Sequence, residues 1–197
     1  MQAASWGLGP RLLLAPVPAV VGYAAWSPLN ARFLFEDDWY VYFWYPPVMD
    51  VLFGLLVLAP FVVGPRPWPR VLALVVVSIV AHAFAVAAVV HSQWLPVPAW
   101  DLRFLAVLPI AILVTLVLVQ VTLRIARVAP VPGSWRHAPV AGTVAGVFFV
   151  ITMETDSAAT SWLYEHGLPW MLWHVASCIA IYSSRGTGPW PMKEAPR

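Results

Sequence analysis

Ionisable side chains inside apolar stretches are the residues of this sequence best placed to do chemistry. Asp50, His82 and His174 lie within long apolar segments, and Glu154 and Asp156 follow another such segment. An unpaired charge in hydrocarbon is costly, so an ionisable residue at such a position is by default a candidate functional residue. We therefore predict that these five residues contribute to a polar site within or beside a membrane.

The spacing of the residues around these positions suggests shared helix faces. At about 100° per residue, Ser78 and His82 fall on one stripe, and Trp170 and His174 lie broadly on one side of their segment, next to Trp173. We expect Ser78, His82, Trp170 and Trp173 to bind substrate. The alternative is simple packing, because serines in spans often bond to their own helix and a lone histidine is often a satisfied core residue.

One chemistry that suits these residues needs no cofactor. A carboxylic acid in an apolar, aromatic-lined pocket has a raised pKa and stays protonated near neutrality, so it can protonate an alkene or epoxide. Tryptophan faces can stabilise the resulting cation. In this interpretation Glu154 or Asp156 is the acid, Asp50 or His174 accepts the proton, and the substrate is an isoprenoid, a sterol-like molecule or another lipid.

A second chemistry uses zinc. A catalytic zinc needs three protein ligands and a bound water, and His91, His174 and Asp101 supply one such set. The sequence contains no His-Glu-x-x-His, Gly-x-Ser-x-Gly, phosphate-binding-loop or dinucleotide-binding motif. We expect no cofactor, with zinc as the alternative.

Three short segments occur in an order that resembles a known family. They are residues 43–48 (FWYPPV), His91 followed by residues 107–110 (VLPI), and residues 171–174 (MLWH). Together they resemble pieces of the bacterial alkaline ceramidases, which belong to a wider group of seven-helix membrane hydrolases and receptors with a zinc held by three histidines. The resemblance implies a zinc-dependent amide hydrolase in which His91 and His174 are two of the ligands.

The chain departs from that family at several points. The matched pieces cover about 40 of the 197 residues, and two helices are missing between the second and third pieces. Ala87 stands where the family has a serine, and Trp170 stands where the third histidine belongs. Asp101 is one choice for the family's aspartate, although alignment through residues 107–110 places Ala106 there. These departures put the zinc site in doubt.

The composition predicts the elements that must position these side chains. The chain is 61% hydrophobic and 10% charged, whereas soluble domains average about 25% charged residues. Because a helix crosses the hydrocarbon with roughly 17–25 apolar residues, we predict an all-α bundle of six membrane spans. The expected spans are residues 12–27, 46–64, 71–91, 104–123, 140–153 and 168–183. The first contains two prolines, and the fifth is short unless it borrows residues 135–138.

The distribution of charge predicts the orientation of these spans. Eight of the nine acidic residues lie in or beside the first, third and fifth loops, and nine of the eleven basic residues lie in the other loops and the termini. Since basic residues stay on the cytoplasmic side, both termini are expected to be cytoplasmic. We predict one transmembrane domain over residues 1–185, followed by a flexible cytoplasmic tail over residues 186–197.

Several classes of function are disfavoured. The net charge of +2 is spread over short loops, so we expect no nucleic acid as partner. The single cysteine, Cys178, cannot form an intrachain disulfide, and the absence of repeats disfavours a transporter. The sequence therefore predicts a multi-pass protein of the bacterial inner membrane whose partners are the bilayer and a hydrophobic small molecule. We expect this protein to be an isomerase or cyclase. The alternatives are a zinc amide hydrolase and a non-enzymatic accessory subunit or small-molecule binder.

Overall fold

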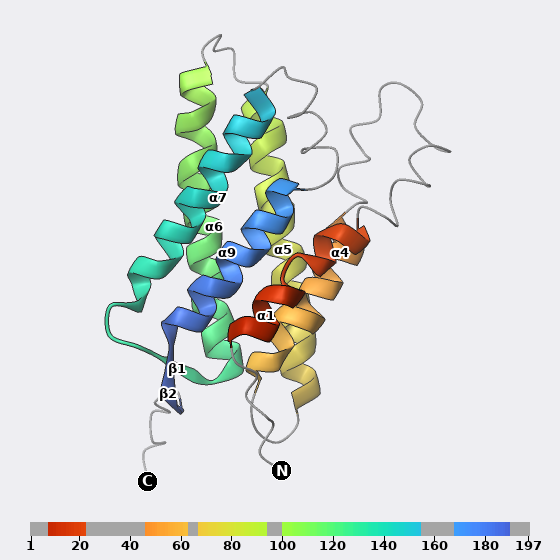
Figure 1. Ribbon diagram of the computed structural model, residues 1–197, viewed down its shortest axis with the longest axis vertical. Helices are drawn as coiled ribbons and strands as arrows, with labels where there is room; N and C mark the ends of the chain where they lie inside the picture. Colours follow the sequence, from red (N-terminus) through yellow and green to blue (C-terminus); the bar gives the residue numbers. More distant parts are fainter. Residues whose placement is uncertain (1–7, 23–45, 63–66, 94–99, 155–167, 190–197) are drawn as a thin grey trace.

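The computed structural model describes residues 8–22, 46–62, 67–93, 100–154 and 168–189. These residues are mostly helical, which confirms the all-α class predicted from the composition. The helices lie side by side in one bundle (Figure 1).

The bundle contains four long helices and a broken N-terminal pair. The long helices are α5 (Pro67–Gln93), α6 (Trp100–Ala126), α7 (His137–Glu154) and α9 (Leu168–Ser184). Helix α7 begins before residue 140, so the expected short fifth segment does borrow residues from its N-terminal flank.

The N-terminal helices are interrupted at prolines. Helix α1 (Leu8–Leu14) ends at a turn that contains Pro16, and residues 17–22 are helical again. Helix α4 (Pro46–Phe53) continues into a wide π-helical turn (Gly54–Leu58) and a tight 3-10 turn (Ala59–Phe61) that contains Pro60. A proline has no backbone N–H and crowds the preceding turn, which explains both departures from regular α-helix.

Successive helical segments run in alternate directions. Neighbours in the chain pack together, since α4 contacts α5, α5 contacts α6, α6 contacts α7 and α7 contacts α9. Both ends of the described chain lie at the same end of the bundle (Figure 1). An even number of helical segments in alternate directions brings the two ends together in this way.

That common end is closed by a small sheet and two side-chain hydrogen bonds. Strand β1 (Val128–Pro130) pairs with strand β2 (Arg185–Pro189) in antiparallel fashion. The Ser184 hydroxyl donates to the carbonyl of Ser134 at 3.3 Å, and the Arg11 guanidinium donates to the carbonyl of Pro60 at 3.3 Å. These contacts join α1 to the 3-10 turn that follows α4, and the ends of α6 and α9 to each other and to the segment before α7.

The sheet changes the picture of the C-terminal tail. The sequence predicts flexibility from residue 186 onward, but residues 186–189 belong to β2. A Cβ on Gly186 would lie 2.9 Å from the carbonyl oxygen of Ala129. The glycine therefore allows a close approach of two backbones, whereas its residue type alone suggested flexibility. Residues 190–197 lie outside the described part of the chain.

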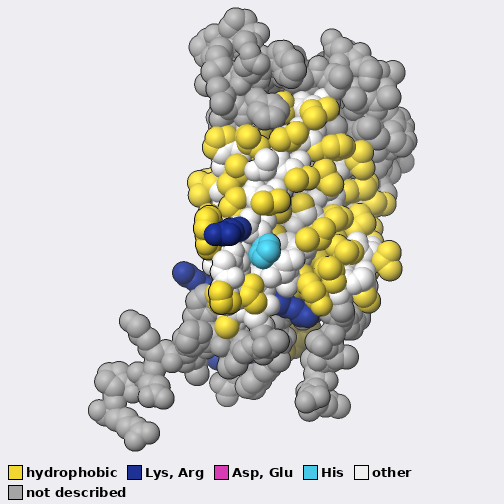
Figure 2. Space-filling view, turned by 60° about the vertical axis from the view of Figure 1, so that its left-hand side comes forward, with side chains coloured by type: hydrophobic (Ala, Val, Ile, Leu, Met, Phe, Trp, Pro, Cys, Tyr) yellow, Lys and Arg dark blue, Asp and Glu magenta, His cyan; other side chains and the backbone are white. Residues whose placement is uncertain are grey.

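Charges are segregated between the two ends of the bundle. We call the closed end the arginine end. Six of the seven described arginines lie there: Arg11, Arg70, Arg124, Arg127, Arg136 and Arg185. At the opposite end, α6 begins beside Asp101 and α7 ends at Glu154. In Figure 2 the basic side chains likewise gather in the lower part of the visible face.

The surface between the two ends is apolar (Figure 2). Large hydrophobic side chains are exposed along the helices, among them Leu72, Phe84, Leu113, Val140 and Ile151. Two helices carry segments long and apolar enough to cross a membrane, Pro67–Ala85 in α5 and Val107–Ala126 in α6, and only 28% of each segment is buried. The apolar helices Leu8–Gly22 and Val48–Phe61 are shorter.

Helices α6 and α7 approach each other closely at a glycine. A Cβ on Gly142 would lie 2.6 Å from the Cα of Ile112 and 2.8 Å from the carbonyl oxygen of Ala111. Small residues let helix backbones approach in this way. The crossing holds α7 against α6 at the level of the polar residues described next.

Candidate functional site

Fully buried polar side chains from three helices meet inside the bundle. Asp50 comes from α4, Ser78 and His82 from α5, and His174 from α9, and each has no exposed surface. Ser78 and His82 are one turn apart on α5, so they share a face. The structure therefore brings together four of the side chains that the sequence predicted for a polar site.

Asp50 and His82 form the centre of this site. The Nδ1 atom of His82 lies 3.2 Å from Oδ1 of Asp50, an ion-pair distance without hydrogen-bond geometry, and the Ser78 hydroxyl lies beside the same carboxylate. A carboxylate at Nδ1 orients an imidazole and stabilises its charged form, which leaves Nε2 as the atom that can exchange a proton with a substrate. The pair has the composition of a general acid/base.

Aromatic rings enclose both histidines. Trp170 stacks on His82 with ring centroids 4.2 Å apart and planes 24° apart, and Trp173 meets the same ring edge-on at 6.3 Å. Phe53 stacks on His174 at 4.2 Å and 15°. These contacts fix the planes of the two imidazoles, and an aromatic face favours an adjacent cation.

Trp173 is held in place by a threonine of α6. Its Nε1 donates to Oγ1 of Thr115 at 3.1 Å, and the Thr115 hydroxyl donates to the carbonyl of Ala111 at 2.7 Å. Thr115 is fully buried. The two hydrogen bonds satisfy the indole inside the bundle and set the position of one wall of the site.

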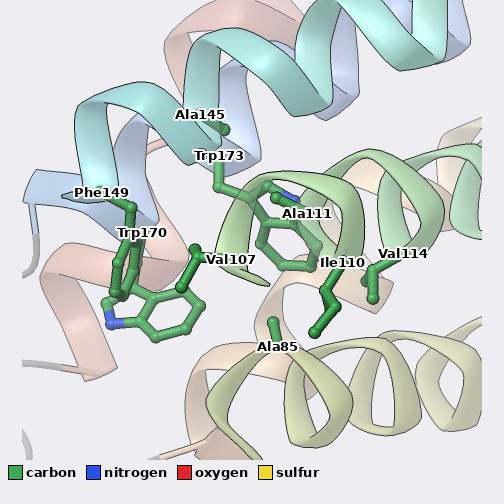
Figure 3. A pocket seen from close by; sticks show the side chains of 10 residues that line it. Ala85, Val107, Ile110, Ala111, Val114, Ala145, Phe149, Trp170 and Trp173 are labelled. Atoms are coloured by element: carbon green, nitrogen blue, oxygen red, sulfur yellow. The ribbon is translucent and has the colours of Figure 1, made fainter. Parts of the chain in front are cut away.

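An apolar cleft adjoins the two tryptophans (Figure 3). Trp170 and Trp173 project into it from α9, while α5, α6 and α7 supply small and aliphatic side chains together with Phe149. The lining residues are Ala85, Val107, Ile110, Ala111, Val114, Ala145, Gly146, Phe149, Trp170 and Trp173. The cleft is narrow and its lining is almost entirely apolar.

The side chains of the other predicted site residues are not described by the structure. His91 and Asp101 are near the ends of α5 and α6, and Glu154 ends α7, but their side chains lie outside the described part of the structure. Asp156 lies outside the described residues altogether. Their roles as acids or zinc ligands stay predictions.

Metal binding finds no support among the described side chains. Within residues 8–22, 46–62, 67–93, 100–154 and 168–189, no group of three His, Cys, Asp or Glu side chains is arranged to hold a metal ion. The set of His91, His174 and Asp101 includes two side chains that are not described, so it is not tested by this result.

Comparisons with protein-family models, with curated proteins and with solved structures find no match. The resemblance to alkaline ceramidases therefore stays a prediction from the sequence.

Proposed function

We propose that the chain is a multi-pass protein of the bacterial inner membrane with both termini in the cytoplasm. The apolar outer surface, the two helices of spanning length and the alternation of the helices support this proposal. The concentration of arginines at one end supports the orientation, because basic residues favour the cytoplasmic side.

Cysteine labelling tests the orientation. In a Cys178→Ala background, we expect Glu154→Cys to react with a membrane-impermeant maleimide in intact spheroplasts. Trp135→Cys, at an exposed position on the arginine end, should react only after lysis. Labelling of Trp135→Cys from outside the intact spheroplast would reverse the orientation.

We further propose that the protein is an enzyme that moves a proton on a lipid-soluble substrate. The observation that carries this proposal is the fully buried Asp50–His82 pair at 3.2 Å, which contacts Trp170, a residue that lines an apolar cleft. His82 removes a proton from an activated carbon through Nε2 and returns it to another carbon, while Asp50 stabilises the imidazolium between the two steps. The narrow cleft favours isomerisation of a slim chain over cyclisation, and no cofactor is needed. Glu154 and Asp156 remain candidate acids at the outer end.

Exchange with heavy water tests this proposal for any lipid substrate. We expect the protein, incubated in nanodiscs with a bacterial lipid extract in D₂O, to place one deuterium on a carbon of an isoprenoid or related lipid, detected by mass spectrometry. A proton that passes through a titratable side chain exchanges with solvent, which is why the label enters. Asp50→Asn and His82→Gln should reduce the labelling by a factor of about 100 or more.

Cys178→Ala is the matched control for these variants. Cys178 is fully buried, as Asp50 is, and lies on a helix that supplies the cleft, so its loss should leave the labelling unchanged. Labelling that persists in Asp50→Asn would contradict the proposed acid/base pair. If no lipid is labelled by the wild-type protein, the zinc hydrolase and the non-enzymatic accessory or binding role become the leading functions.

A further inference from the structure

Helix α9 carries buried polar groups that the proposed reaction does not use. His174 and Ser177 are fully buried and lie three residues apart, so they share one face of the helix. Within the described residues, neither ring nitrogen of His174 has a hydrogen-bond partner. The Ser177 hydroxyl has none there either. Thr122 of α6 is equally buried, and its hydroxyl also has no hydrogen-bond partner within the described residues.

His174 belongs to the same buried site as His82. Both imidazoles contact the indole of Trp173, His82 at 6.3 Å and His174 at 5.5 Å between ring centroids. The two histidines also lie within electrostatic reach of each other. The Nε2 atom of His82 has no hydrogen-bond partner in the described structure, so a polar group between the two rings would serve both.

The groups without a described hydrogen-bond partner lie at successive depths along the bundle. At about 1.5 Å per residue, His174 lies about 15 Å from the arginine-end terminus of α9, and Ser177 lies about 10 Å from it. Thr122 lies about 6 Å from the corresponding terminus of α6, and α6 packs against α9. The series therefore descends from the Asp50–His82 pair toward the arginine end.

Buried polar groups in proteins are almost always hydrogen-bonded, and where side chains do not suffice, ordered water completes the set. We propose that water molecules bridge His82, His174, Ser177 and Thr122 and form a proton path between the Asp50–His82 pair and the arginine end. A proton leaving His82 Nε2 passes to a water, which gives one of its own protons to the next acceptor, and each group is restored by the next transfer. The role of this path in turnover rests on the proposed isomerase function. The presence of the bridging water molecules does not depend on that function.

Histidine hydrogen exchange tests the path on the full chain. The imidazole C2 hydrogen exchanges with D₂O only where water reaches the ring, and mass spectrometry of peptides reports each histidine separately. We expect His82 and His174 to exchange in the wild-type protein in nanodiscs, with the exposed His137 as internal reference. Ser177→Val should slow exchange at both buried histidines by about tenfold or more and leave His137 unchanged.

Ser177→Thr is the matched variant, because threonine has the shape of valine and keeps the hydroxyl. It should exchange as the wild type does, which separates loss of the hydroxyl from disturbed packing. Two results would overturn the path. In the first, His82 and His174 stay unlabelled in the wild type while His137 exchanges fully, which means a dry interior. In the second, Ser177→Val exchanges at the wild-type rate, so water does not enter past residue 177.

This experiment and the lipid-labelling experiment test the water path and the proposed reaction independently. Exchange at His82 without deuterium in any lipid would keep the water path and remove the proposed reaction. Deuterium in a lipid together with wild-type exchange in Ser177→Val would keep the reaction and remove the path.

Discussion

Replacing His82 by leucine should lower the free energy of unfolding by about 3–5 kcal/mol, because it leaves the carboxylate of Asp50 buried without its partner. Asp50→Leu should cost a similar amount, since it strands the imidazole in the same apolar surroundings. Denaturant titration of the detergent-solubilised protein, followed by far-ultraviolet circular dichroism, measures both changes.

The double variant Asp50→Leu/His82→Leu should be far less destabilised than the sum of the two single variants. Replacing both members of a buried pair by apolar side chains is often neutral, and the difference from additivity measures the coupling between the two residues. Asp50→Leu combined with Gly9→Ala is the control, because an added Cβ on Gly9 meets no atom within 4 Å and its effect should add independently. Additive losses in the double variant would show that the two side chains do not interact.

Gly142→Ala should destabilise the bundle by about 3 kcal/mol. The new Cβ would lie 2.6 Å from the Cα of Ile112 and 2.8 Å from the carbonyl oxygen of Ala111. Both atoms are backbone, so no side-chain rotation relieves the contact, and α6 and α7 must separate. The same denaturant titration reports the loss.

Two other glycines provide graded controls for this prediction. A Cβ on Gly146 would meet the Ala111 Cβ at 3.1 Å and the Leu108 Cδ1 at 3.2 Å, and a leucine terminus can move, so Gly146→Ala should cost about 1 kcal/mol. Gly9 has no atom within 4 Å of such a Cβ, and Gly9→Ala should be neutral or slightly stabilising. Equal effects at positions 142 and 9 would mean that the close crossing is absent from the solubilised protein.

The sequence predicted the helices well because long apolar segments bounded by charges have few alternatives. It also predicted a polar site that includes Asp50, Ser78, His82 and His174, since each is a polar residue within an apolar stretch. The sequence did not predict the pairing of Asp50 with His82. Helical periodicity shows which residues share a face of one helix, but not which faces of different helices meet, and these two residues are 32 positions apart.

Residues with little chemical signature of their own were missed. Phe53 acts only as a stacking surface for His174, and apolar residues of this kind fill the whole segment. Thr115 lies on a mildly polar line of its helix, but its role depends on the indole of Trp173 arriving from α9. The pairing of β1 with β2 also depends on two distant segments meeting, which no local pattern records.

The wide turn over Gly54–Leu58 and the tight turn over Ala59–Phe61 have opposite effects on the winding of the segment that follows α4. A π-helical turn rotates side chains by less than an α-helix does, and a 3-10 turn rotates them by more. The two offsets oppose each other, and the inward face carries buried residues from Asp50 through Val57 to Phe61. One continuous inward face thus reaches from the Asp50 carboxylate, beside His82, to the ring of Phe61. The Arg11 guanidinium lies over that ring, 3.9 Å from its centroid. An insertion or deletion at the turn would rotate one end of this face against the other, so the position of the Asp50–His82 pair depends on the same turn as the contact of Phe61 with the N-terminal helix.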